Sequence, residues 1–169
     1  MKDQLIKRLT EYYKLERFHV VWLSLFGLFL NVKYGWRPTL LLTYGIGLVL
    51  LVLAQGTYYW RQKLATVQGE RRRPERILRH FHGFQWVNVC VIVAYPVLVM
   101  LLNARFAHTW AAQTHTEWAL FAYLFGVAEH VNYYHVQLMY DNRNDWRYLR
   151  AYKRLKMAAL RKDFKKNTL

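Results

Sequence analysis

The chain has 169 residues, of which 54% are hydrophobic and 17% are aromatic, and it carries 25 Lys and Arg residues against 10 Asp and Glu residues. This amount of apolar material excludes an intrinsically disordered chain, which requires low hydrophobicity. The presence of a single cysteine, Cys90, excludes a small scaffold held by internal disulfides. The length is that of one domain, and we expect residues 1–169 to form a single unit.

The charged residues occur in blocks, and long uncharged stretches separate these blocks. A helix needs about 20 apolar residues to cross the hydrocarbon core of a bilayer, which is roughly 30 Å thick. Three stretches have this length, and in the third of them Glu129 is the only charged residue. These three predicted transmembrane spans are residues 38–60, 83–104 and 118–140.

A further predicted span, at about residues 18–33, is shorter than the others. The flanking Arg17 and Lys33 can extend toward the lipid headgroups and so make up the missing length. No small-residue cleavage site follows it, so we expect this segment to be retained rather than removed as a signal peptide. The sequence therefore predicts an all-α integral membrane protein, a four-helix bundle with short connections.

The basic residues are distributed unequally between the two sides of this bundle. Residues 1–17, 61–79 and 143–166 together contain 22 Lys and Arg residues, whereas the connections on the opposite side contain three. Because cytoplasmic loops carry the excess of Lys and Arg, we expect both termini in the cytoplasm. The expected location is the bacterial cytoplasmic (inner) membrane, and the lack of an Asn-x-Ser/Thr glycosylation acceptor is compatible with a bacterium.

The basic C-terminal tail, residues 141–169, has the pattern of an amphipathic helix. From Asp145 onward, apolar residues recur at helical spacing from Tyr148 to Ala159, and arginines cover the other faces. We expect this helix, and a similar N-terminal one that contains Leu9, to lie at the inner membrane surface with cations against anionic lipid headgroups. The arginines assigned to lipid headgroups are Arg71, Arg72, Arg73, Arg147, Arg150 and Arg154.

Membrane lipids are therefore the expected partners of the basic segments. A plainer interpretation is that these charges only set the topology and hold the termini to the membrane. The segments also leave open docking to a larger membrane complex or to further copies of the chain. No motif that reads bases accompanies the charge, so we expect no nucleic-acid partner.

The span at 118–140 differs from the other three because its second half is polar. Glu129 lies at the midpoint of this range, and His130 follows it. A charge at the bilayer centre costs about 2.5–3.5 kcal/mol on insertion scales, so we expect Glu129 to be neutral or paired inside the bundle. At about 100° per residue, Glu129 shares a helix face with Ala122 and Gly126, a small-xxx-small pair that favours close helix contact.

The third span offers hydrogen-bonding partners at a matching depth. Pro96 leaves the carbonyl of Ile92 without its helical donor, and a protonated Glu129 or His130 can donate to it. Tyr95 can bond to either side chain. The predicted site for a small ligand or a proton, open toward the cytoplasm, comprises Glu129, His130, Asn132, Tyr133, His135, Gln137 and Tyr95.

Other histidines leave open a metal or haem site. His130 and His135 are five residues apart and do not converge on one helix face, so partners from other helices are required. A carboxylate-bridged di-iron centre is excluded because the spans contain one acidic residue. The ligands expected for a metal or haem are His80, His82, His135 and His19.

Two classes of function follow from this pattern, and the sequence does not assign catalytic residues to either. The first is a buried polar site around Glu129 and His130 that binds a small ligand, a metal or a proton. The second is a non-catalytic subunit or a homo-oligomeric assembly protein, in which the polar face of the fourth helix is a helix–helix interface. A continuous aqueous pore within one protomer is not expected, because residues 119–125 carry almost no polar group.

Overall fold

The computed structural model describes residues 2–70, 73–105, 115–140 and 143–169. These residues form helices joined by short connections, with one isolated β-bridge between Val136 and Met157. The helices are α1 (Lys2–Tyr34), α2 (Leu40–Val67), α3 (Pro74–Arg105), α5 (Thr116–Tyr134), α6 (Arg143–Tyr152) and α7 (Ala159–Lys166).

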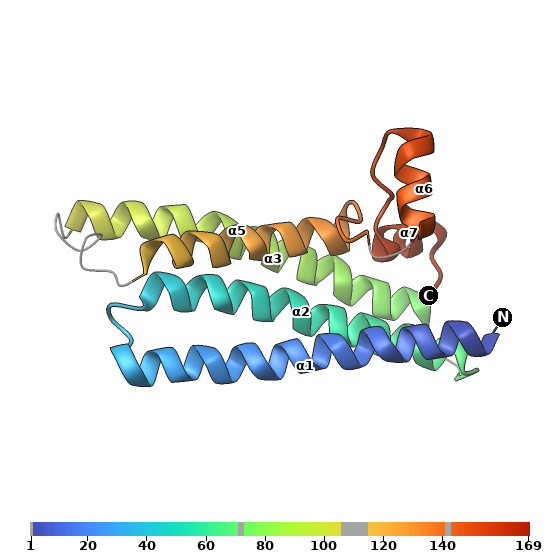
Figure 1. The fold of residues 1–169 in the computed structure, drawn as a ribbon, viewed down its shortest axis with the longest axis horizontal. Helices are drawn as coiled ribbons and strands as arrows, with labels where there is room; N and C mark the ends of the chain where they lie inside the picture. The colour runs from blue at the N-terminus through green and yellow to red at the C-terminus, as the bar shows by residue number, and fades with distance from the viewer. Residues whose placement is uncertain (1, 71–72, 106–114, 141–142) are drawn as a thin grey trace.

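The four long helices α1, α2, α3 and α5 run alternately up and down along one axis (Figure 1). The N-terminus, the connection from α2 to α3, and the helices α6 and α7 all lie at the same end, which we call the basic end. Helix α2 is central, because it packs along both α1 and α5 and also contacts α3. The apolar window of α2 is 56% buried, against 11% in α1 and in α3, so α1 and α3 present apolar faces outward.

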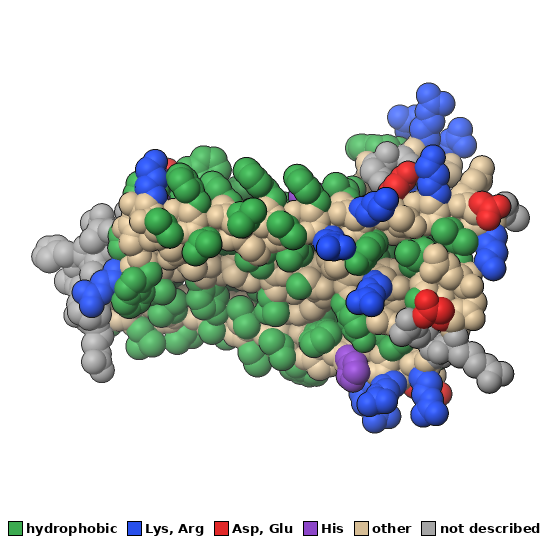
Figure 2. Space-filling model, turned by 90° about the horizontal axis from the view of Figure 1, so that it is seen from below, with side chains coloured by type: hydrophobic (Ala, Val, Ile, Leu, Met, Phe, Trp, Pro, Cys, Tyr) green, Lys and Arg blue, Asp and Glu red, His purple; other side chains and the backbone are tan. Residues whose placement is uncertain are grey.

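Within the described parts of the chain, three helices, α1, α2 and α3, are long and apolar enough to cross a membrane. Their outward faces carry large apolar side chains, such as Phe18 and Trp22 of α1 and Trp86 and Met100 of α3. Figure 2 shows apolar side chains along the body of the molecule and most Lys and Arg side chains toward one end. This surface is that of an integral membrane protein rather than of a soluble bundle, which buries its large apolar side chains.

Small residues allow α5 to approach α2 closely. A Cβ atom added to Gly45 would lie 2.9 Å from the Cβ of Ala122, and one added to Gly126 would lie 2.7 Å from Cγ of Leu48. The predicted close contact through Ala122 and Gly126 is therefore confirmed, and its partner is α2.

The span predicted at residues 118–140, the last along the chain, is placed wrongly at its C-terminal end. Helix α5 ends at Tyr134 rather than at Tyr140. After Tyr134 the backbone makes hydrogen bonds to a distant segment instead of continuing the helix. The backbone amide of Gln137 donates to the carbonyl of Lys156 at 2.7 Å, next to the β-bridge. Glu129 consequently lies five residues before the end of α5, about 7.5 Å along the axis, and not at its midpoint.

The prediction of a single amphipathic helix in the C-terminal tail is also wrong. Helix α6 ends at Tyr152, and Lys153 adopts a left-handed backbone conformation with φ of 48°, which a continuing helix does not allow. The second helix, α7, packs against α5 and buries Leu160 to 1% exposure. The N-terminal stretch is not a separate surface helix either, because it continues without a break into the first predicted span.

Candidate functional site

Glu129 and His130 follow each other on α5, and the structure places them in different surroundings. Consecutive residues of a helix point about 100° apart, so they face different neighbours. His130 enters a buried polar network between α2, α3 and α5. Glu129 lies in a half-buried cluster that includes side chains of α1. The single predicted site is therefore two sites.

The first site, which we call the amide network, consists of Gln55 on α2, Asn88 on α3, and His130 and Tyr134 on α5. Gln55 and Asn88 exchange two hydrogen bonds of 2.8 Å through their amide groups. The Tyr134 hydroxyl donates to Oε1 of Gln55 at 2.7 Å, and Nδ2 of Asn88 lies 3.2 Å from Nδ1 of His130. Because an amide NH2 can only donate, Nδ1 of His130 accepts, and its proton is on Nε2.

The amide network is closed to its surroundings. Asn88 is fully buried, and the other three residues are at most 6% exposed. Buried polar groups stabilise a helix contact when each finds a partner. The network therefore ties the three helices together, and its geometry fits a packing role better than ligand binding.

The second site, which we call the carboxyl cluster, consists of Glu16 and His19 on α1 and Glu129, Asn132 and Tyr133 on α5. The Tyr133 hydroxyl donates to Oε1 of Glu16. The contact passes across α2 at Gly56, where an added Cβ would overlap the Tyr133 phenol. The absence of a side chain at Gly56 therefore allows a residue of α5 to reach α1.

The two carboxyl groups of this cluster are close enough to repel each other electrostatically. Nδ2 of Asn132 lies 3.4 Å from Oε2 of Glu129, and His19 is near enough to attract the Glu129 carboxylate. The second oxygen of Glu16, Oε2, is buried and has no hydrogen-bond partner among the described residues. The cluster thus contains two acidic groups with fewer donors than their oxygens can accept.

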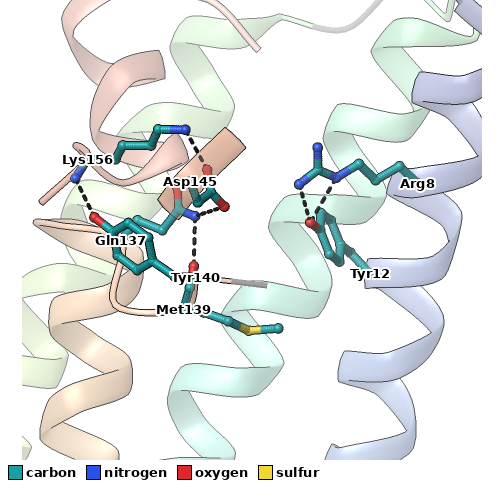
Figure 3. Close-up of polar contacts among 7 residues, drawn as sticks. All are labelled: Arg8, Tyr12, Gln137, Met139, Tyr140, Asp145 and Lys156. Atoms are coloured by element: carbon teal, nitrogen blue, oxygen red, sulfur yellow. Dashed lines mark hydrogen bonds and ion pairs between the residues drawn. The ribbon is translucent and has the colours of Figure 1, made fainter. Parts of the chain in front are cut away.

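Asn132 connects the carboxyl cluster to the segment after α5. Its Oδ1 accepts a 2.8 Å hydrogen bond from the backbone amide of Leu138, while its amide faces Glu129. Gln137 lies outside the cluster: its Nε2 donates to Oδ2 of Asp145 at 2.9 Å and to the carbonyl of Met139 at 2.8 Å (Figure 3). Lys156 forms an ion pair with the same Asp145. Gln137 and Lys156 together hold Asp145, and with it α6, against the segment that follows α5.

Pro96 lies inside α3, and the carbonyl of Ile92 accepts a hydrogen bond from another helix, as expected. The donor differs from the prediction, because it is the hydroxyl of Tyr123 at 3.2 Å rather than Glu129 or His130. Tyr95 also lies away from Glu129. Its ring stacks on Tyr123 with centroids 4.1 Å apart, and its hydroxyl is buried without a partner among the described residues.

The four histidines expected to hold a metal or haem are not brought together. His82 stacks on Phe164 with ring centroids 4.2 Å apart, and His135 meets His130 edge to face at 5.5 Å. Across the described ranges, no three side chains of His, Cys, Asp or Glu are grouped as metal ligands. The remaining predicted metal ligands are His19, in the carboxyl cluster, and His80, exposed on α3.

The arginines that the sequence assigns to lipid headgroups lie at the basic end, for those members that the structure describes. Arg147 and Arg150 are exposed on α6, Arg73 is exposed just before α3, and Arg154 lies beyond the end of α6. Arg71 and Arg72 are outside the described residues.

Sequence reasoning missed Glu16, because it stands between Lys14 and Arg17 and so counted as one of the charges that flank a span. The available signal was helical register: Glu16 and His19 are three residues apart and share a face that continues to Leu23.

No protein-family model, curated protein or solved structure matches this chain. The chemistry of the carboxyl cluster is therefore inferred from its own side chains. Two carboxyl groups, a phenol, an amide and an imidazole can bind and release a proton, or hold a small cation through the oxygen atoms. The set contains no thiol or aliphatic hydroxyl, so it offers no nucleophile of the Cys, Ser or Thr type.

Proposed function

We propose that this chain is a four-span protein of the bacterial inner membrane and that its carboxyl cluster binds and releases a proton. The observation that supports this function is the convergence of Glu16 and Glu129, from α1 and α5, with one carboxylate oxygen buried and unpaired. Two carboxyl groups that interact in a poorly solvated site titrate as a coupled pair, because each negative charge opposes ionisation of the other.

Several neighbours of the pair suit proton exchange. The Tyr133 hydroxyl already donates to Glu16, and Asn132 joins Glu129 to the segment that follows α5 at the basic end. With that end in the cytoplasm, the proton would enter and leave from the cytoplasmic side. His130 is not part of this exchange, since the amide network occupies its Nδ1.

The proposal is tested by infrared difference spectroscopy of the full chain in lipid nanodiscs between acidic and alkaline pH. A protonated carboxyl group in an apolar site gives a carbonyl band distinct from that of water-exposed acids. We expect this band to shift in Glu16→Gln and in Glu129→Gln, because each variant keeps one of the two carboxyl groups, and to be lost in the double variant Glu16→Gln/Glu129→Gln. The matched control is Glu117→Gln, an exposed acid in the first turn of α5, which should leave the band unchanged. Retention of the band in the double variant would reject the proposal.

The second candidate function, a non-catalytic or homo-oligomeric assembly protein, predicts that the polar face of α5 is an intermolecular interface. The contacts favour the first function, because His130, Tyr133 and Tyr134 find their partners on α1, α2 and α3 of the same chain. The two functions are separated by Glu129→Leu: an assembly role predicts a changed oligomer size in detergent, whereas a proton site predicts an unchanged one.

A further inference from the structure

Helix α6 has one face attached to the protein and one face that is exposed. On the attached side, Asp145 is 4% exposed, and it is held by Lys156 and Gln137 (Figure 3). On the other side, three arginines recur at i, i+4 and i+7, which places them in one row along a helix. They are Arg143, Arg147 and Arg150, and all three are exposed.

Apolar side chains lie beside the row of arginines on the same helix. They are Trp146, which is exposed, and Leu149, which is half-buried. Trp146 is 61% exposed. Tryptophan is enriched at the boundary between lipid headgroups and acyl chains, so this exposed indole suits a membrane surface. A surface with both guanidinium groups and an exposed indole matches the phosphates and upper acyl chains of a lipid monolayer.

The orientation of α6 fits this partner. Figure 1 shows α6 crossing the direction of the four long helices, at the basic end. If the long helices follow the membrane normal, α6 lies parallel to the membrane plane, where the apolar belt of the molecule gives way to basic residues (Figure 2). The attachment through Asp145 holds this orientation before any lipid binds, so little ordering entropy is lost on binding.

We propose that Arg143, Arg147 and Arg150 of α6 form a preoriented binding surface for the phosphates of anionic phospholipids, with Trp146 inserted beside them. This surface is independent of the carboxyl cluster and of its proposed protonation. It differs from the headgroup set expected from the sequence, because Arg143 replaces Arg154, which lies past the end of the helix.

The test compares amide hydrogen exchange of residues 143–152 in the full chain, in nanodiscs of phosphatidylcholine alone and of phosphatidylcholine with phosphatidylglycerol. We expect exchange in α6 to slow at least threefold when phosphatidylglycerol is present. The triple variant Arg143→Gln/Arg147→Gln/Arg150→Gln should lose this slowing. The charge-matched control is Lys162→Gln/Lys165→Gln/Lys166→Gln, which removes three exposed cations of α7 and should keep it.

Two further arms separate the alternatives. Inorganic phosphate added to phosphatidylcholine nanodiscs tests a free anion, and equal slowing there would overturn lipid binding. Equal loss in both triple variants would show that the response follows total charge and would also overturn the proposal. Exchange of residues 159–166 serves as the folding control in the arginine variant, and Arg143→Lys/Arg147→Lys/Arg150→Lys keeps the charge if the glutamine variant unfolds.

Discussion

Gly56 is the residue that decides where the Tyr133 side chain goes. Every larger residue would place a Cβ inside the Tyr133 phenol, which packs across α2 to reach Glu16. Glycine in the middle of a helix is otherwise unfavourable, by about 1 kcal/mol relative to alanine. At position 56 this loss of helix stability is offset by the contact between Tyr133 and Glu16, which only glycine leaves room for. The carboxyl cluster therefore depends on Gly56.

We therefore expect Gly56→Ala to destabilise the protein by about 1–3 kcal/mol, because overpacking forces Tyr133 away from Glu16. The control is Gly47→Ala on the same helix, where a Cβ meets nothing within 4 Å and helix propensity alone acts. That variant should be neutral or more stable by up to about 1 kcal/mol. Thermal unfolding in detergent measures both, and equal effects of the two substitutions would contradict the close approach at Gly56.

At the scale of the element, α7 is a docked helix and not a free tail. Leu160 is 1% exposed and packs with Tyr59 and Phe81, and Asp163 accepts hydrogen bonds of 2.6 Å from the Tyr59 hydroxyl and from Lys63. An ion pair at this depth requires good geometry and additional partners, and here the phenol supplies one. The docking therefore combines apolar burial with a charge that is satisfied from α2.

Leu160→Ala should undock α7, since truncating a buried leucine costs about 2–5 kcal/mol, comparable to the free energy available to one short helix. Limited proteolysis of the tail and hydrogen exchange of residues 157–166 should both increase strongly. Leu155→Ala is the matched control, because Leu155 is 42% exposed. If proteolysis and hydrogen exchange of the tail in Leu160→Ala stay as slow as in the native chain, Leu160 does not hold α7 in place.

Acidification should loosen the same element through His135, which lies just beyond α5 and accepts a hydrogen bond from Ala158 through its carbonyl. Burial lowers the pKa of His135 below its ordinary value of 6.5, and the neighbouring Arg161 lowers it further. A base whose pKa is depressed by folding contributes stability that is complete above about pH 6.5 and decreases as the pH falls below it.

Hydrogen exchange of residues 157–166 should therefore accelerate between about pH 7.5 and about pH 5 beyond the intrinsic effect of pH. The variant His135→Gln should have a weaker dependence, because the titrating group is gone. If hydrogen exchange depends on pH in the same way in His135→Gln and in the native chain, a group other than His135 causes the effect.

The elements show where reasoning from sequence succeeds and where it stops. Helix α2 covers residues 40–60 of the span expected at 38–60, because a long uncharged stretch has few alternatives to a buried helix. The end of α5 was missed because residues 136–140 are uncharged, and charge was the only boundary signal used. The pairing of Gln137 with Lys156 is a contact between distant residues, which local periodicity does not reveal.

The candidate site follows the same division. The polar face of α5 was evident from composition, and Glu129, Asn132 and Tyr133 do lie in one cluster. The partner on α1 was not evident, because it depends on which helices pack together and on the space left by Gly56.

At the scale of the whole molecule, charge and apolar surface are arranged along one axis. The termini and the connection between α2 and α3 share an end. The sequence segments 1–17, 61–79 and 143–166, whose described parts lie toward this end, contain 22 of the 25 Lys and Arg residues. The opposite end carries the connection between α1 and α2. This asymmetry supports our proposal that the basic end is cytoplasmic.

The orientation is tested with single cysteines in a Cys90→Ser background and a membrane-impermeant maleimide. We expect Trp36→Cys, in the connection between α1 and α2, to react in intact spheroplasts. Gln4→Cys and Asn167→Cys, at the two ends of the chain, should react only in inverted vesicles. Labelling of all three positions from one side would reject an even number of spans with both ends inside.

The unbroken course of α1 has a mechanical consequence. Its 33 residues extend for about 50 Å, whereas the hydrocarbon layer is roughly 30 Å thick, so in the topology that we propose about two fifths of α1 would lie outside that layer. Glu16 is rigidly joined to that overhang, since no hinge intervenes between it and Lys2. A displacement of the N-terminal part of α1 would therefore also displace Glu16 relative to the Tyr133 hydroxyl that bonds to it.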